Sequence, residues 1–510
     1  MSDSVKKDMV DLLDQELNRF KKTTDGKKVK PRCEVKLKHS EIPEYIYKKL
    51  EVVDFKSEAD FGKDDKNKKP TLRHYIYTCT EKLIEAMDSL GLGLCYRDGQ
   101  IYAFNGEYWR QIPLLAFQNF MGRSAVKMGV NKFTAEIYTF KEQLAKQFMS
   151  AAYVDSVLER SKKDCHKALI NLKNGTFELS DQVLKLREPD KDDFLTYQLN
   201  FEYDEKAECP LFEKFLNRVL PDKTLQMILA EYIGYIFIKS EYLKLEKVLL
   251  LHGSGANGKS VFFEIIYALL GGKENVCNFS LENLTSASGY HRAMLGGKLL
   301  NYATEISSKI NESIFKQLAS GEPVEARMPY GDPFILTNYG KMIFNCNYLP
   351  KTKDYSEAFY RRFIIIPFDV TIPKEEQDKQ LANKIIKNEL PGVFSWVLEG
   401  FKRLVTQKEF TKNRQNEVII NDYKIEGNSV ISFINDKGYT ISHNETMTIS
   451  KLYDEYQDYC FYEKLDCVTK REFTNRLRAE GFKIVRRNYG MAIYLILGDE
   501  SVRGVGENEL

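Results

Sequence analysis

A glycine-rich segment between an apolar run and a helical pattern carries the strongest chemical signal in the chain. Gly253-Ser-Gly-Ala-Asn-Gly-Lys-Ser260 matches GxxxxGK[ST]; it follows the apolar run Lys247–His252 and precedes the helical spacing of Val261–Leu270. Such glycines let backbone N–H groups turn inward around phosphate oxygens at a helix amino terminus. Lys259 is then expected on the β- and γ-phosphates of ATP, and the Ser260 hydroxyl on Mg²⁺. The predicted ATP-binding residues are Gly253, Ser254, Gly255, Ala256, Asn257, Gly258, Lys259 and Ser260.

A carboxylate and an amide follow two further apolar runs downstream. Glu305 ends the run Lys298–Ile306, where an acid can hold the Mg²⁺ shell or orient the attacking water. Asn345 and Asn347 end the run Lys341–Pro350, where an amide can bond the γ-phosphate or the lytic water. On chemistry alone the two asparagines are equal candidates, and either can be a plain turn residue.

Two adjacent arginines, Arg361 and Arg362, precede a fourth apolar run, Phe363–Phe368. A guanidinium held rigidly there can act in trans on the transition state of a neighbouring subunit, while the alternative is a salt-bridged strand start. Short, continuously apolar runs are typical of buried parallel strands. The centre of the chain is therefore predicted to be a parallel α/β core.

The segments before this core predict a mixed α/β region. Helical periodicity over Leu72–Leu92 precedes short strands in Cys95–Trp109, which turn at Asp98-Gly99 and Asn105-Gly106. Trp109 is expected to be a core anchor. The remaining expected elements are a helical region from about Gln111 to Lys163, a hairpin turning at Asn174-Gly175 within Ile170–Leu179, and helices over Pro210–Ile238 on both sides of Pro221.

The C-terminal third predicts helices and then a small basic domain. A helical stretch runs from about Glu375 to Val405, with Trp396 on its apolar face, and a polar linker follows near Thr411–Asn416. A basic helix over Lys470–Gly481 precedes a hairpin over Phe482–Leu497, and this order suggests a winged helix that binds duplex DNA. The alternative is a winged helix that contacts protein and has a solvated basic face. The candidate phosphate contacts are Lys470, Arg471, Arg476, Arg478, Arg486 and Arg487.

Composition excludes several classes of protein. The 510 residues suffice for about two to four domains. The 75 Lys and Arg balance 73 Asp and Glu, so any nucleic-acid contact must come from local patches. No apolar run approaches the roughly 20 residues of a membrane span. Nine cysteines without a CxxC pair and six histidines without a cluster predict a cytoplasmic protein with reduced cysteines and no zinc.

The motifs, taken in order, resemble those of superfamily 3 AAA+ helicases. The similarity is to the satellite-phage and poxvirus helicase-primase branch, including replication initiator helicases of phages and staphylococcal-type mobile genetic islands. It covers roughly Leu169 to Phe368 and is looser at both ends. The segments that carry it are Ile170–Thr176, Cys209–Phe215, Gly253–Ser260, Glu305, Lys316–Glu322, Asn347–Pro350 and Arg361-Arg362.

The resemblance implies a role for each motif. Glu305 matches the catalytic acid and Mg²⁺ residue, Asn347 rather than Asn345 the sensor, and Arg362, with Arg361 as second candidate, the trans-acting finger. Lys316–Glu322 matches the motif before a hairpin that lines a central pore. Relatives carry Lys or His near the hairpin tip, where this chain has Gly331. The DNA-contacting candidates of this region are Lys316, Arg327 and Tyr330.

The expected function is therefore an ATP- and Mg²⁺-dependent DNA replication helicase. The resemblance implies a homo-hexameric ring that moves 3′ to 5′ on single-stranded DNA, with origin duplex bound at the C-terminal domain. The alternative is an origin-binding initiator whose ATPase controls only assembly. Primase activity is not expected, because two-metal nucleotidyl transfer needs paired carboxylates and the only candidate pair, Asp190 and Asp192, lies in a Pro-bounded loop without supporting His or Arg motifs. A small-molecule kinase would share the phosphate loop but would lack the motifs at Lys316–Glu322 and Asn347. The expected divisions are a mobile basic tail (1–40), an α+β domain (41–209), the ATPase domain (210–410), a winged helix (420–498) and a tail (499–510).

Overall fold

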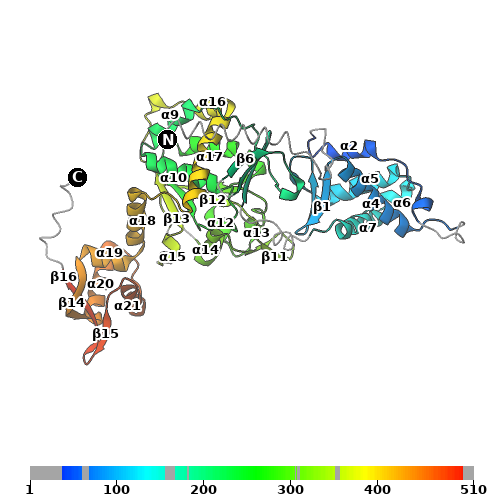
Figure 1. Cartoon of the computed structure of the whole chain (residues 1–510). Helices are drawn as coiled ribbons and strands as arrows, with labels where there is room; N and C mark the ends of the chain where they lie inside the picture. The colour runs from blue at the N-terminus through cyan, green and yellow to red at the C-terminus, as the bar shows by residue number, and fades with distance from the viewer. Residues whose placement is uncertain are drawn as a thin grey trace.

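The computed structural model describes residues 37–59, 68–154, 167–180, 183–304, 306, 310–350 and 356–497. Figure 1 shows three parts in a row, with blue and cyan helices at one end, a central sheet in green and yellow, and an orange and red part at the other end. Most of the predicted basic tail and all of the tail 499–510 lie outside the described residues. The described end of the first tail is docked, because Asn105 Nδ2 donates to Leu37 O at 2.8 Å.

The N-terminal part places helices around a three-stranded antiparallel sheet. The expected turn at Asp98-Gly99 is confirmed, and both residues have positive φ angles. Trp109 is buried and its Nε1 donates to Lys191 O at 2.8 Å, so it is a core anchor as predicted. The elements are α2 (Ile42–Lys49), α3 (Phe55–Glu58), α4 (Leu72–Ser89), β1 (Gly93–Arg97), β2 (Gln100–Phe104), β3 (Trp109–Ile112), α5 (Leu114–Lys127), α6 (Lys132–Glu136) and α7 (Tyr138–Ala151).

A second antiparallel sheet joins this part to the centre. The predicted turn at Asn174-Gly175 is confirmed, and a third strand was not predicted. Phe177 packs against Phe394 of the central core at 6.1 Å between ring centroids, so packing does not divide at residue 209, where the domain boundary was expected. The strands are β4 (Lys167–Leu172), β5 (Gly175–Ser180) and β6 (Val183–Arg187).

The central part contains a five-stranded sheet in the order β13-β7-β12-β9-β8, with every pairing parallel. The predicted central parallel sheet is thus confirmed. Its strands are β7 (Val248–His252), β8 (Val276–Cys277), β9 (Leu300–Ala303), β12 (Lys341–Cys346) and β13 (Phe363–Pro367). Because the strands are parallel, their carboxyl ends meet at one edge of the sheet and their amino ends at the other.

Helices cover both faces of this sheet, as buried parallel strands require. The helix expected from about Glu375 to Val405 begins only at Leu381 and is interrupted at Glu389. Pro391 lies in the first turn of a new helix that starts at Leu390, and the buried Glu389 carboxylate accepts from Phe212 N at 2.9 Å. One face carries α9 (Pro210–Val219), α10 (Lys223–Tyr235), α11 (Lys259–Leu269), α16 (Leu381–Asn388) and α17 (Leu390–Gln407). The other carries α12 (Leu281–Thr285), α13 (Tyr290–Ala293), α14 (Glu312–Ser320), α15 (Glu357–Tyr360) and α18 (Arg414–Gly427).

The polar linker expected near Thr411–Asn416 is instead bonded to the central part. Thr411 Oγ1 donates to the buried Glu231 at 2.6 Å, and Asn416 Oδ1 accepts from Ile365 N at 2.8 Å. Local polarity suggested a linker, but these side chains satisfy buried polar groups of other elements.

The C-terminal part has its own core and the order helix, strand, two helices, hairpin. The predicted basic helix and hairpin are present, and one strand, β14, was not predicted. None of the described helices combines the length and apolarity needed to cross a membrane. The elements are α19 (Ser429–Asp436), β14 (Tyr439–Thr448), α20 (Ile449–Glu463), α21 (Lys470–Ala479), β15 (Ile484–Arg487) and β16 (Gly490–Leu497).

Candidate nucleotide site and hairpin

The glycine-rich segment forms the connection from β7 to α11, at the carboxyl edge of the sheet. Gly255 and Gly258 have φ angles of +123° and +88°, and even Ala256 is left-handed at +50°. A Cβ at Gly253 would lie 2.4 Å from Phe368 O, and one at Gly258 would lie 2.8 Å from Val219 Cγ1. Glycine is therefore required here both by backbone conformation and by close packing.

Lys259 folds back over this loop. Its Nζ donates to Gly253 O at 2.6 Å and to Asn257 Oδ1 at 3.1 Å, while Asn257 Nδ2 donates to Phe368 O at 2.8 Å. The side chain is buried, and burial lowers the pKa of Lys259. Both of these acceptors are neutral oxygens of the loop itself, so the ammonium can exchange them for phosphate oxygens.

The residues around Lys259 fit a nucleotide with Mg²⁺. Ser254, Gly255 and Ala256 are exposed, so phosphate oxygens can approach this part of the loop, where backbone N–H groups can bind them. Ser260 is exposed in the first turn of α11, where its hydroxyl can reach a metal ion bound to those phosphates. Glu305, the predicted acid, lies outside the described residues, two positions after the end of β9.

The two candidate asparagines differ in position. Asn345 is buried, and its Oδ1 accepts from the Tyr302 hydroxyl at 3.1 Å. Asn347 is exposed just past the end of β12, beside the phosphate loop, since Gly253 N donates to Cys346 O at 3.1 Å. The packing therefore makes Asn345 a structural residue and leaves Asn347 able to meet a nucleotide.

The asparagines can be separated by substitution. We expect Asn347→Ala to lower ATP turnover by about 10–100-fold with little change in melting temperature, because a donor to the γ-phosphate or the water is lost. Asn345→Ala is expected to lower stability by about 1–3 kcal/mol, because the Tyr302 hydroxyl loses its buried acceptor. Steady-state hydrolysis and thermal melting of both variants give the comparison. The reverse pattern would make Asn345 the sensor.

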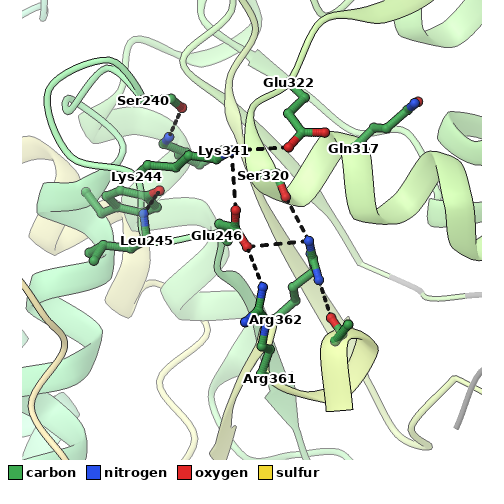
Figure 2. Close-up of polar contacts among 12 residues, drawn as sticks. Ser240, Lys244, Leu245, Glu246, Gln317, Ser320, Glu322, Lys341, Arg361 and Arg362 are labelled. Atoms are coloured by element: carbon green, nitrogen blue, oxygen red, sulfur yellow. Dashed lines mark hydrogen bonds and ion pairs between the residues drawn. The ribbon is translucent and has the colours of Figure 1, made fainter. Parts of the chain in front are cut away.

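Arg361 and Arg362 precede β13 and therefore lie at the amino edge of the sheet, opposite the phosphate loop. Figure 2 shows both arginines beside Glu246. Arg362 O accepts from Val248 N at 2.7 Å, at the amino end of β7. The five residues of β7 separate this point from Gly253, a span of roughly 15 Å. Neither guanidinium lies at the phosphate loop of the same chain. Arg362 is buried, whereas 58% of the Arg361 side chain is exposed.

A hairpin follows α14, as the motif order predicted, and consists of β10 (Val324–Arg327) and β11 (Pro333–Leu336). Tyr330 stands at its tip, fully exposed and left-handed with φ +61°. Arg327 Nε donates to Gly331 O at 2.8 Å, which braces the tip. Lys316 is not on the hairpin: its Nζ lies 3.4 Å from Ser356 Oγ at the start of α15.

Arg292, which the sequence did not single out, supports the hairpin from α13. Its guanidinium is buried and donates to Glu325 O at 2.8 Å and to Leu284 O and Ser286 O at 2.9 and 2.6 Å. Two of these carbonyls lie at the end of α12 and the third lies in β10, so no local pattern indicated this role.

The C-terminal basic residues separate into two groups. Arg476 faces its own domain, where it pairs with Glu472 at 3.0 Å and donates to Asn428 Oδ1 at 3.2 Å. The other five candidates are exposed, although Arg487 donates to the Tyr494 hydroxyl at 2.6 Å. The exposed candidates are Lys470, Arg471, Arg478, Arg486 and Arg487.

Two known families match parts of the chain. Residues 82–221 match the family described as "D5 N terminal like". Residues 251–362, which include the phosphate loop and both arginines, match a "Family of unknown function (DUF5906)".

Similar proteins come from large DNA viruses. "Putative helicase L207/L206" of Acanthamoeba polyphaga mimivirus is 27% identical over 51% of this chain and 27% of its own length. "Putative helicase 184R" of Invertebrate iridescent virus 6 is 25% identical over 59% of this chain and 35% of its own length. The chain thus spans about a quarter to a third of these relatives. The apo structure of the NrS-1 C-terminal region aligns with a TM-score of 0.43 at 12% identity, covering 81% of this chain and 98% of that one.

Proposed function

We propose that this chain, a relative of the superfamily 3-like helicase-primases of phages and viruses, is the ATP-driven helicase that opens DNA during replication of a phage, plasmid or mobile element. It works as a homo-hexameric ring and draws single-stranded DNA through the pore, with 3′ to 5′ polarity. Its ATPase core is of the AAA+ type, and ATP and Mg²⁺ are its cofactors.

One observation carries this proposal: the phosphate loop and the paired arginines lie at opposite edges of one sheet. A site that uses both groups must take them from two different subunits. Head-to-tail contacts of this kind close into rings when their rotation allows closure. Because each site is completed by a neighbour, binding or hydrolysis of ATP in one subunit can also affect the next subunit around the ring.

The residues of each subunit then have separate tasks. The Gly253–Gly258 loop binds phosphate oxygens through its N–H groups, and Lys259 leaves its two loop acceptors to neutralise the γ-phosphate. Ser260 and Glu305 would hold Mg²⁺, which would stabilise charge on the phosphoryl oxygens. Asn347 orients the water or the γ-phosphate, and an arginine of the neighbouring subunit stabilises the transition state.

The β10–β11 hairpin is the element that grips DNA. We expect Tyr330→Ala to weaken single-stranded DNA binding by about tenfold and to reduce unwinding more than ATP turnover, because one stacked base loses its platform. Fluorescence anisotropy and strand displacement measure the two effects. Tyr138→Ala, which removes a similarly exposed tyrosine far along the chain, is the matched control. Equal DNA binding by both variants would contradict this role.

Strand displacement on forked DNA with ATP and Mg²⁺ tests the proposed function itself. Wild type should displace the strand, and forks with only a 3′ or only a 5′ tail should show the polarity. ATP hydrolysis and DNA binding without displacement would favour the second candidate, an origin-binding initiator whose ATPase controls only assembly.

The C-terminal part supports that second activity as well, and the two can coexist. The order α19-β14-α20-α21-β15-β16 agrees with a winged helix, in which α21 would enter the major groove and β15–β16 would lie on the backbone. Lys470, Arg471, Arg478, Arg486 and Arg487 would contact phosphates there. Arg476, which is tied to Glu472 and Asn428, would position α21 instead.

A further inference from the structure

Glu246 lies at the centre of a cluster of charges at the amino edge of the sheet (Figure 2). Its Oε2 lies 3.3 Å from an Arg361 nitrogen and 3.4 Å from an Arg362 nitrogen, and its Oε1 lies 3.4 Å from Lys244 Nζ. Burial raises the pKa of Glu246, but the bond from Lys244 and the charges of Arg362, Lys244 and Arg361 hold it below its ordinary value. One ionised carboxylate thus faces three cations.

The backbone at Glu246 is held in an uncommon conformation. Its φ angle is +56°, in the left-handed region that residues with a side chain rarely adopt. Both flanking residues are anchored: Leu245 N donates to the Tyr235 hydroxyl at 3.3 Å, and Lys247 Nζ donates to Arg361 O. Such conformations persist where the surroundings enforce them, and they concentrate at functional sites.

The two arginines are held very differently. Arg362 is buried, and besides Glu246 it donates to Ser320 Oγ at 3.0 Å and to Ala358 O. Its Nε is buried without a hydrogen-bond partner in the described part of the chain. The Arg361 side chain is mostly exposed and pairs with Glu246. Arg361 can therefore swing outward at little cost, whereas Arg362 cannot leave without exposing several buried polar atoms.

The same cluster reaches the base of the hairpin. Ser320 is the last residue of α14, and only three residues separate it from β10. Movement of the hairpin on DNA would therefore shift the Ser320 hydroxyl, which accepts a hydrogen bond from Arg362. A second connection, from Lys244 to Glu322 at 3.1 Å, is about half exposed on both sides and contributes little.

We propose that Glu246 is a positioning residue that aims Arg361 at the nucleotide of the neighbouring subunit, and that Arg362 with Ser320 relays the state of the hairpin to it. The inference rests on the proposed function and deepens it. It assigns the trans-acting role to Arg361 and makes the buried Arg362 the relay, which reverses the order that the motif resemblance implies.

The test uses the full chain with Glu246→Gln, Arg361→Ala, Arg362→Ala and Ser320→Ala, and with Glu241→Gln as control for a nearby exposed glutamate. We expect Glu246→Gln to lower kcat for ATP about tenfold or more at unchanged KM, since the phosphate loop is intact. Adding Lys259→Ala subunits to the Glu246→Gln variant should restore turnover. The Lys259→Ala subunits keep Glu246 and both arginines, and they can present these arginines to the intact phosphate loops of the Glu246→Gln subunits. Ser320→Ala should reduce the stimulation of hydrolysis by single-stranded DNA.

The outcomes distinguish failure of the positioning role from failure of the proposed ring. If Arg361→Ala lowers turnover but Glu246→Gln matches the Glu241→Gln control, Glu246 has no positioning role. A raised KM or a defect that Lys259→Ala subunits do not restore would make its role merely structural. If neither arginine variant changes turnover, the shared site fails, and with it the proposed ring. Thermal melting of each variant shows whether it is folded.

Discussion

Lys259→Ala is expected to lower ATP hydrolysis by at least about a hundredfold and to abolish strand displacement. The ammonium is the charge that the loop offers to the β- and γ-phosphates, and a lost donor of this kind costs about 10²–10³ in rate. In the fold the Lys259 ammonium donates only to neutral acceptors, Gly253 O and Asn257 Oδ1. The substitution therefore leaves no unpaired carboxylate among its partners. The fold should therefore survive. A coupled assay of phosphate release measures the effect.

Lys298→Ala is the matched control for this substitution. Lys298 also donates to two carbonyls, Lys273 O at 3.0 Å and Glu274 O at 2.7 Å, but it precedes the amino end of β9. We expect it to melt at a slightly lower temperature and to hydrolyse ATP. Substantial hydrolysis by Lys259→Ala would show that the glycine-rich loop does not bind the reacting phosphates.

Mixing two inactive variants is expected to restore ATP hydrolysis. Lys259→Ala subunits keep their arginines, and subunits with both Arg361→Ala and Arg362→Ala keep their phosphate loop. In a randomly mixed ring about a quarter of the interfaces combine the two intact halves, so turnover should rise toward about a quarter of the wild-type rate. The physical reason is the opposite placement of the two groups in each subunit.

The control for mixing is a single chain that carries all three substitutions. Added to wild type it should only lower turnover, and added to Lys259→Ala it should restore none. The Lys259→Ala variant and the variant with both Arg361→Ala and Arg362→Ala must each be folded and oligomeric. If their mixtures then hydrolyse no ATP at any ratio, the arginines do not complete a neighbour's site.

The strands and turns whose sequence patterns depend only on neighbouring residues were predicted correctly. The four apolar runs became β7, β9, β12 and β13, because continuous apolarity is possible only where both faces of a strand are buried. The turns at Asp98-Gly99 and Asn174-Gly175 followed from the preference of such pairs for tight hairpins. Elements without such patterns were missed, among them β6, β8 and β14, α12 and α13, and the extent of α18.

Only the tertiary structure decided which polar residues are available. Asn345 and Asn347 are two positions apart and chemically identical, yet the Tyr302 hydroxyl occupies one and the end of β12 exposes the other. In the sequence Arg476 cannot be distinguished from its basic neighbours, but in the fold its guanidinium is bound by Glu472 and Asn428.

The phosphate loop was determined by the sequence itself, because glycine spacing, a preceding apolar strand and a following helix are all local properties. The contacts around the arginines, Glu246 with Arg362 and Arg362 with Ser320, join segments that are distant along the chain. Such contacts depend on how the helices and strands pack, and side-chain periodicity carries no information about them. The phosphate loop and the two arginines can thus be located in the sequence, while the side chains that hold each arginine appear only in the fold.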